Sequence, residues 1–200
     1  MAKVIKFPVP APEKFGPERV RKKKDEGGEK NKDAQLNLFI SAKVVRMHQL
    51  SPFDEALMMD DQGEKGKAKA GYQKAIDEGD SMADALCNLA IIESQEGSTA
   101  KAIDHFTQCL KHEPRHHEAH YNLANLYAEI GNFPLARVHY EIAIEIEPSF
   151  TNSYFNLGLT LAMIKDFKEA VKAIRQYREL TPHENHRQTD ELLFKLNSTL

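Results

Sequence analysis

The chain has 200 residues, of which 28% are charged and none is tryptophan; this composition fits one medium-sized, well-hydrated domain with a tail. No apolar run approaches the length that spans a bilayer, and prolines and Lys6 interrupt the early apolar residues, so we expect neither a membrane segment nor a secretory signal. Cys87 and Cys109 lie in helical patterns rather than in metal-ligand spacing, which predicts reduced packing thiols in a cytoplasmic protein.

The charge is distributed unevenly along the chain. Residues 1–50 hold 12 lysines and arginines against 6 acidic residues, a net charge of +6, whereas residues 51–200 hold 15 against 24, a net charge of −9. A basic leader therefore precedes an acidic body. Because nucleic acid is a polyanion, the acidic body makes it an unlikely ligand of the folded part.

The first 34 residues are predicted to be a disordered basic leader. They are rich in lysine, glutamate, proline and glycine, with RVRKKKDEGGEKNKD at the centre. Such a segment cannot bury enough apolar surface to offset the entropy lost on ordering. Arg19 and Arg21 could contact phosphates, but the neighbouring acids dilute the positive charge, which favours a role in solubility.

Residues 35–48 differ from this leader and are predicted to form an extended docking segment. Apolar residues alternate there with the period of a strand: Leu36, Leu38, Ile40, Ala42 and Val44. Three interpretations remain open. The segment could lie along the first repeat of the body, insert into a groove of its own chain or of a neighbouring chain as a dimer contact, or bind an external protein.

The external alternative rests on a short motif. Gln35, Leu36, Leu38 and Phe39 fit Gln-Leu-x-Leu-Phe, which resembles the peptide by which many bacterial replication and repair proteins bind the DNA-polymerase sliding clamp. In that family of motifs the glutamine makes polar contacts at a pocket rim, and the leucine and phenylalanine fill apolar pockets. A sliding-clamp accessory protein is therefore one alternative function.

The body repeats itself every 34 residues without a slip in register. One position carries only alanine: Ala68, Ala102, Ala136 and Ala170. Four residues later a large apolar side chain recurs: Tyr72, Phe106, Tyr140 and Ile174. In the other half of each unit a leucine precedes a small residue, as in Leu123-Ala124 and Leu157-Gly158. Both halves have helical apolar spacing, with Asn132 and Asp166 placed to cap the next helix.

These units resemble the tetratricopeptide repeat family, whose 34-residue units are pairs of helices. The resemblance implies an all-α, right-handed superhelical solenoid over residues 49–182. Its expected units are 49–82 (degenerate, with Glu55 where leucine is expected), 83–116, 117–150 and 151–182. Residues 183–200 are predicted to be a capping helix that covers the last repeat with Leu192, Leu193, Leu196 and Phe194.

The same resemblance places the first helix of each unit on the concave side. The expected groove residues are Asn88, Ile91, Tyr121, Asn122, Asn125, Phe155, Asn156, Leu159 and Met163. Asn88, Asn122 and Asn156 are in register, and a carboxamide can both donate to and accept from the backbone of an extended peptide. Because Cys87, Tyr121 and Phe155 stand where some family members have basic residues, no clamp for a C-terminal carboxylate is expected.

Candidate chemistry is limited to a histidine cluster. His116 and His120 are four residues apart, a spacing used by paired metal ligands, but no HExxH motif is formed, so both are weak metal candidates. The sequence shows no phosphate loop or nucleophile elbow. We therefore expect a non-enzymatic adaptor without a cofactor that binds a protein or peptide partner, with a metal-binding protein as a lesser alternative.

Overall fold

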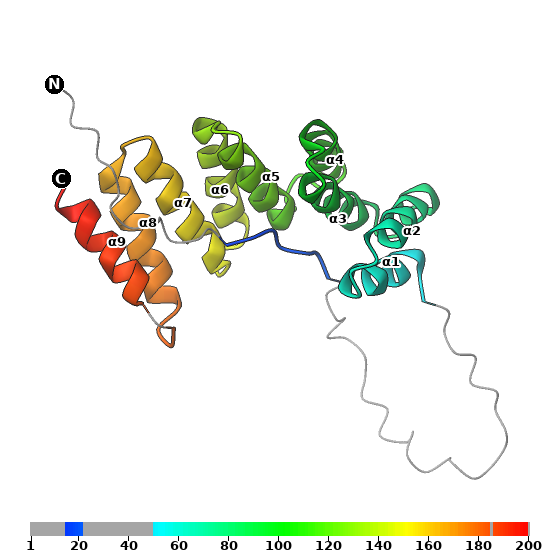
Figure 1. Ribbon diagram of the computed structural model, residues 1–200, viewed down its shortest axis with the longest axis horizontal. Coiled ribbons are helices and arrows are strands. Elements are labelled where there is room, and N and C mark those ends of the chain that lie inside the picture. Colours follow the sequence, from blue (N-terminus) through cyan, green and yellow to red (C-terminus); the bar gives the residue numbers. More distant parts are fainter. Residues whose placement is uncertain (1–14, 22–49, 185, 200) are drawn as a thin grey trace, which may run out of the picture.

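The computed structural model describes residues 15–21, 50–184 and 186–199, and these residues form nine α-helices and no strand. Figure 1 shows consecutive helix pairs standing side by side from α1–α2 at one end to α7–α8 and the single helix α9 at the other. The bounds are α1 Pro52–Asp61, α2 Lys65–Glu78, α3 Met82–Gln95, α4 Thr99–His112, α5 His117–Glu129, α6 Phe133–Ile146, α7 Thr151–Met163, α8 Phe167–Leu180 and α9 Arg187–Asn197. None of these helices is long and apolar enough to cross a membrane.

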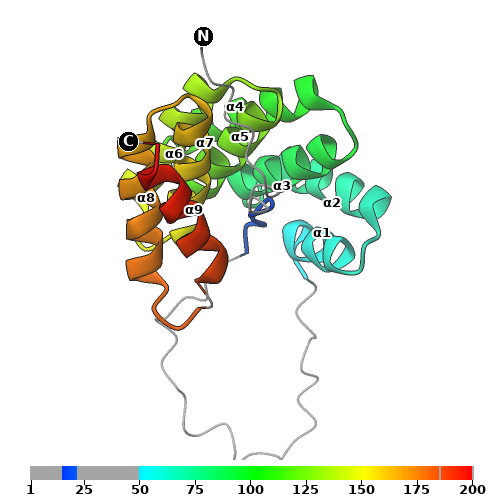
Figure 2. The same ribbon diagram turned by 60° about the vertical axis from the view of Figure 1, so that its left-hand side comes forward.

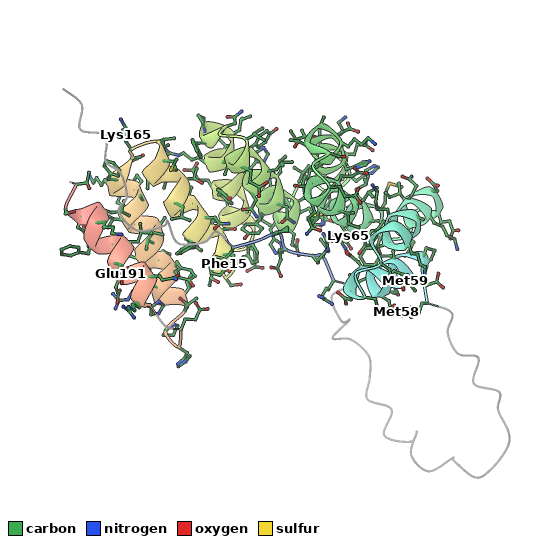
Figure 3. All side chains as sticks on the ribbon, viewed as in Figure 1. Phe15, Met58, Met59, Lys65, Lys165 and Glu191 are labelled. Atoms are coloured by element: carbon green, nitrogen blue, oxygen red, sulfur yellow. The ribbon has the colours of Figure 1, made fainter. Side chains whose placement is uncertain are left out.

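The caps predicted at Asn132 and Asp166 are confirmed, and the structure shows a third cap at Ser51. Ser51 Oγ accepts a hydrogen bond from the Asp54 amide at the start of α1, and Asn132 and Asp166 do the same at the starts of α6 and α8. Each cap satisfies an amide that has no partner within its helix. The turn between the two helices of a unit places Gly63, Gly97 and Gly131 at positive φ. Lys165, at the same position of the last unit (labelled in Figure 3), has φ 65° without the freedom of glycine.

The two helices of each unit occupy two layers. Helices α3, α5 and α7 each bury nine residues around most of their circumference. Helices α4 and α6 bury only a stripe of three, made of the alanine or cysteine and the aromatic residue of the repeat. The second helices therefore form the outer layer, and their repeated positions fill the space behind the inner layer. Cys87 and Cys109 are free, buried thiols in this core, as expected.

The small residue of the inner helix sets how closely the layers approach. A methyl group added to Gly158 in α7 would lie 2.4 Å from Ile174 Cδ1 and 2.6 Å from Ile174 Cγ1 in α8, far inside van der Waals contact. The preceding units pair alanine with an aromatic ring at these positions, Ala124 with Tyr140. Glycine in the last unit therefore accommodates the branched Ile174.

The last helix, α9, covers the end of the stack. Leu192, Leu193 and Leu196 are buried against the last repeat. The prediction for Phe194 was wrong: its side chain is 76% exposed, because it lies between the buried positions of the helix and projects from the opposite side.

A short piece of the leader lies inside the curve of the stack. Figure 2 shows the helix pairs arranged around residues 15–21, which we call the docked segment. The prediction of a disordered leader therefore does not hold for these seven residues. The segment 35–48, with Gln35, Leu36, Leu38 and Phe39, lies outside the described residues.

Candidate peptide-binding groove

Three asparagines hold the docked segment by its backbone, and we call them the asparagine ladder: Asn88 in α3, Asn122 in α5 and Asn156 in α7. Asn88 Oδ1 accepts from the Val20 amide at 2.9 Å and Nδ2 donates to the Val20 carbonyl at 3.0 Å. Asn122 forms the same pair with Glu18, at 2.9 and 2.8 Å, and Asn156 with Phe15, at 3.2 and 3.1 Å. Each rung therefore satisfies both backbone groups of one residue.

The ladder follows from the repeat. Residues 34 apart occupy equivalent places on successive inner helices, so their carboxamides form a row along the groove. The chain crosses this row from α7 towards α3, opposite to the order of the repeats, and Figure 3 shows Phe15 beside α7, away from Met58 and Met59 of α1. The segment forms hydrogen bonds with the ladder through the backbone amides of residues 15, 18 and 20.

Neighbouring polar side chains orient the ladder. Asn125 Oδ1 accepts from Asn156 Nδ2 at 2.8 Å and from the Tyr140 hydroxyl at 2.5 Å. The Tyr121 hydroxyl lies 3.1 Å from the Phe15 carbonyl and 3.0 Å from the Gly16 carbonyl. Burial raises the pKa of the Tyr121 hydroxyl, so this group keeps its proton and donates to the segment.

Two apolar side chains of the segment enter the body. The Phe15 ring packs edge-on against Phe155, with centroids 5.2 Å apart, and lies 5.8 Å from the ring of Tyr177 in α8. Val20 is 5% exposed and belongs to the buried cluster that contains Cys87 and Ile91. The segment thus contributes one aromatic and one aliphatic anchor.

The end of α1 presents two carboxylates to the segment. Asp60 binds Arg19 through Nε at 2.7 Å and Nη2 at 3.2 Å, and also accepts from the Tyr72 hydroxyl at 3.2 Å. Asp61 binds both terminal nitrogens of Arg21 at 3.0 Å. Burial and the nearby Glu118 raise the pKa of the Glu18 carboxyl, so negative charge is disfavoured at that point of the segment.

The residues predicted from the sequence fall into three groups. The three ladder asparagines, Tyr121 and Phe155 contact the docked segment. Asn125 accepts a hydrogen bond from Asn156, which contacts the segment, whereas Ile91 and Leu159 are buried core residues. Met163 is 54% exposed.

Sequence reasoning missed the acidic end and one wall of the aromatic site: Asp60, Asp61 and Tyr177. Two adjacent aspartates and two arginines in alternation, Arg19 and Arg21, are present in the sequence as a signal. The sequence alone does not reveal their pairing, because neighbouring acids make the arginines resemble solubilising charge and no repeat pattern links residues 40 positions apart.

The two histidines considered as metal candidates have separate partners. His116 Nδ1 accepts from the Ala119 amide at 3.1 Å and Nε2 lies 3.1 Å from Asp84. His120 Nε2 lies 3.2 Å from the Pro114 carbonyl and its Nδ1 lies 2.9 Å from His139 Nδ1. Among the described residues, Asp84, Glu113 and His116 offer ligand atoms within 4.8 Å of one another, without His120.

Comparison with family models identifies the repeats. Two models described as tetratricopeptide repeat match residues 83–116, 117–150 and 151–184. No sequence of a curated protein matches the chain at a significant level.

Solved structures share the architecture at low sequence identity. A structure titled MamA 41-end from Desulfovibrio magneticus RS-1 has a TM-score of 0.65 at 19% identity and covers 74% of this chain and 82% of its own. A tetratricopeptide repeat protein from Parabacteroides merdae has a TM-score of 0.64 at 18% identity, covering 74% and 59%. The first repeat domain of Spaghetti (RPAP3), bound to the HSP90 peptide SRMEEVD, has a TM-score of 0.55 at 22% identity, covering 58% and 91%.

Proposed function

Because this chain belongs to the tetratricopeptide repeat family, we propose that it is a non-enzymatic adaptor that binds an extended peptide segment of another protein along its concave groove. The observation that carries the proposal is the asparagine ladder, which satisfies the backbone of the docked segment at Phe15, Glu18 and Val20. Every peptide unit offers the same amide and carbonyl, so the ladder fits an extended chain of many sequences.

The burial of the ladder supports a groove that is filled when the protein is folded. Asn88 and Asn156 are fully buried with the segment in place, and Asn122 is 3% exposed. Burying a carboxamide without partners costs about 1–3 kcal/mol. Three buried asparagines would therefore destabilise a groove that binds only apolar side chains. They stabilise a groove that binds the backbone of a peptide, because the backbone supplies their hydrogen-bond partners.

The solved complex of the Spaghetti (RPAP3) domain with an HSP90 peptide supports a peptide ligand in the groove of this chain as well. That peptide, SRMEEVD, carries three carboxylate side chains. In this chain Asp60 and Asp61 face the groove and bind arginines. An acidic peptide would meet like charge there, so we propose a different class of ligand for this groove.

Fluorescence polarisation tests the proposed function on the full-length chain. The receptor carries Val20→Asp, which places a charge at the apolar anchor and frees the groove of its own leader, and the probe is a labelled peptide of residues 13–23. We expect saturable binding that is lost when the three ladder asparagines are changed to alanine. Asn197→Ala, which removes an exposed carboxamide of α9, is the matched control and should leave binding unchanged. Absence of saturable binding to the unaltered ladder would overturn the proposal.

A further inference from the structure

The ladder binds backbone and cannot choose between sequences, so selectivity has to come from the side chains of the bound segment. Four of the seven docked residues place their side chains against defined groups of the body: Phe15, Arg19, Val20 and Arg21. Gly16 and Pro17 are exposed. The groove is thus specific at one end for an aromatic ring and at the other for three consecutive residues.

The side chains of Arg19, Val20 and Arg21 point to alternate sides of the segment, as in an extended chain. Successive side chains of an extended backbone point to opposite sides. Val20 accordingly enters the buried cluster of α3 and α5, while Arg19 and Arg21 both point to the end of α1. A pattern of arginine, small aliphatic residue, arginine is therefore complementary to this part of the groove.

Of the two arginine sites, the one that binds Arg19 should discriminate more strongly against other side chains than the one that binds Arg21. The side chain of Asp60 is 6% exposed and that of Arg19 is 18% exposed, so the pair is largely withdrawn from water. Two nitrogens of one guanidinium contact the two oxygens of Asp60, a geometry that the single ammonium of lysine cannot reproduce. A buried carboxylate without its cation is costly, and Asp60 would then keep only the Tyr72 hydroxyl among these partners.

The surroundings favour a basic ligand beyond this pair. Asp61 adds a second, exposed carboxylate opposite Arg21. A hollow next to Val20 and Arg21 is lined by Asp84, Glu113, Glu118 and Glu147, with Arg115 and the histidines 116 and 117 as its basic members. The acidic body thus concentrates negative charge where the docked segment ends.

A more specific proposal rests on the proposed function. We propose that the external partner of the groove is a basic extended segment of the pattern aromatic–x–x–x–Arg–aliphatic–Arg, and that residues 15–21 compete with it for the groove. The competition follows from connectivity. Only 28 residues separate Arg21 from Leu50 at the start of the repeats, and a segment tethered this closely acts at an effective concentration on the order of millimolar.

The test compares two full-length receptors and a set of labelled peptides of residues 13–23. The receptors are the natural chain and its Val20→Asp variant; the peptides carry the natural sequence, Arg19→Ala, Arg19→Lys, Phe15→Ala or a scrambled order. We expect the natural peptide to bind the Val20→Asp receptor at least about tenfold more tightly than the natural receptor. Arg19→Ala should weaken binding to the Val20→Asp receptor by about 10- to 100-fold, and Arg19→Lys should recover only part of this loss.

The possible failures are distinguishable. If all peptides, the scrambled one included, bind the Val20→Asp receptor equally, the groove binds peptides without this pattern, and only the specific proposal is wrong. If no peptide binds either receptor, the proposed function itself fails. Equal affinity of both receptors would overturn competition by the leader.

Light scattering on both receptors completes the test. A monomer in both cases supports docking within one chain. A dimer of the natural chain that Val20→Asp dissociates would show that residues 15–21 occupy the groove of a second copy, and would overturn competition within the chain. A second variant, Arg19→Ala with Arg21→Ala in the receptor, leaves the apolar anchors in place and should shift peptide affinity in the same direction as Val20→Asp.

Discussion

Asparagine suits an extended ligand because its carboxamide has the same donor and acceptor as a peptide group. In each rung of the ladder the side chain faces one residue and satisfies its amide and its carbonyl, with distances of 2.8–3.2 Å. Charge plays no part in these bonds, so they hold any sequence that can extend. The proposal therefore assigns binding to the ladder and selection to the anchors Phe15, Arg19 and Val20.

Replacing the central rung by its isostere tests whether the donor is needed. In Asn122→Asp the oxygen that receives the Glu18 amide remains, but the donor to the Glu18 carbonyl is replaced by a carboxylate oxygen that repels it. We expect the docked state to lose about 1–3 kcal/mol. Trypsin cleavage after Arg19 should then accelerate about tenfold or more, because cleavage follows the population of the open state. Asn197→Asp is the control, and an unchanged cleavage rate in Asn122→Asp would contradict the role of the ladder.

The partly buried contact between His120 and His139 predicts that the stability of the repeats depends on pH. Burial, and next the neighbouring His120, lower the pKa of His139 from 6.5 to about 4, and burial lowers that of His120. Since the unfolded chain binds these protons more tightly, the contribution of the pair is present above about pH 6.5 and is lost as the pH falls towards 4. We expect His139 to account for about 1–2 kcal/mol of the acid destabilisation, allowing for its partial exposure.

The last repeat supplies the variant that tests this pair. Tyr154 occupies the place of His120 and its hydroxyl donates to the Pro148 carbonyl, as His120 does to Pro114; Ala173 occupies the place of His139. The double variant His120→Tyr, His139→Ala therefore keeps the bond to the loop and removes both titrating rings. Its melting temperature should fall less than that of the natural chain between pH 7 and pH 4.5. Parallel melting curves over this interval would exclude the pair as a source of the acid sensitivity.

At the scale of the helix pair, the small residue at position 158 determines how closely α7 approaches α8. Gly158→Ala adds a methyl group that collides with Ile174, and overpacking of this kind costs about 1–3 kcal/mol, against a gain in helix propensity of at most about 1 kcal/mol. We expect a lower midpoint of urea unfolding. Adding Ile174→Val removes the Cδ1 atom and should recover part of the loss. Gly66→Ala in α2, where an added methyl meets nothing within 4 Å, is the matched control and should not destabilise.

The elements also show where sequence reasoning succeeds. Alanine and aromatic positions that recur every 34 residues report a packing requirement of every unit, so the helix pairs, their caps and the ladder could be predicted from Ala136, Tyr140 and Asn122 and their equivalents. The docked segment could not. Its binding rests on backbone hydrogen bonds, on two arginines and on two apolar anchors, Phe15 and Val20, and two apolar residues five positions apart form no recognisable period. Residues 35–48 have a clear alternation that predicts docking, but they lie outside the described part of the chain.

At the scale of the molecule, the docked segment joins units that otherwise contact only their neighbours. Stacked repeats gain stability from nearest-neighbour interfaces, but residues 15–21 contact α1, α3, α5, α7 and α8 together. The pair α1–α2 stands at the end of the stack (Figure 1) and is tied to the segment by Asp60 and Asp61. Opening of this end should therefore depend on whether the segment is docked.

Hydrogen exchange of the full-length chain tests this dependence. In Val20→Asp we expect the amides of α1 and α2 to exchange about tenfold faster or more, because the charge at a buried anchor releases the segment and leaves Asp60 without its arginine. Amides of α5 and α6, which keep a repeat on each side, should change less. Val4→Asp, a valine of the same leader outside residues 15–21, is the control for an added charge. Equal acceleration in all helices would mean that Val20 stabilises the whole core rather than one end, and no acceleration would mean that the segment does not tie the stack together.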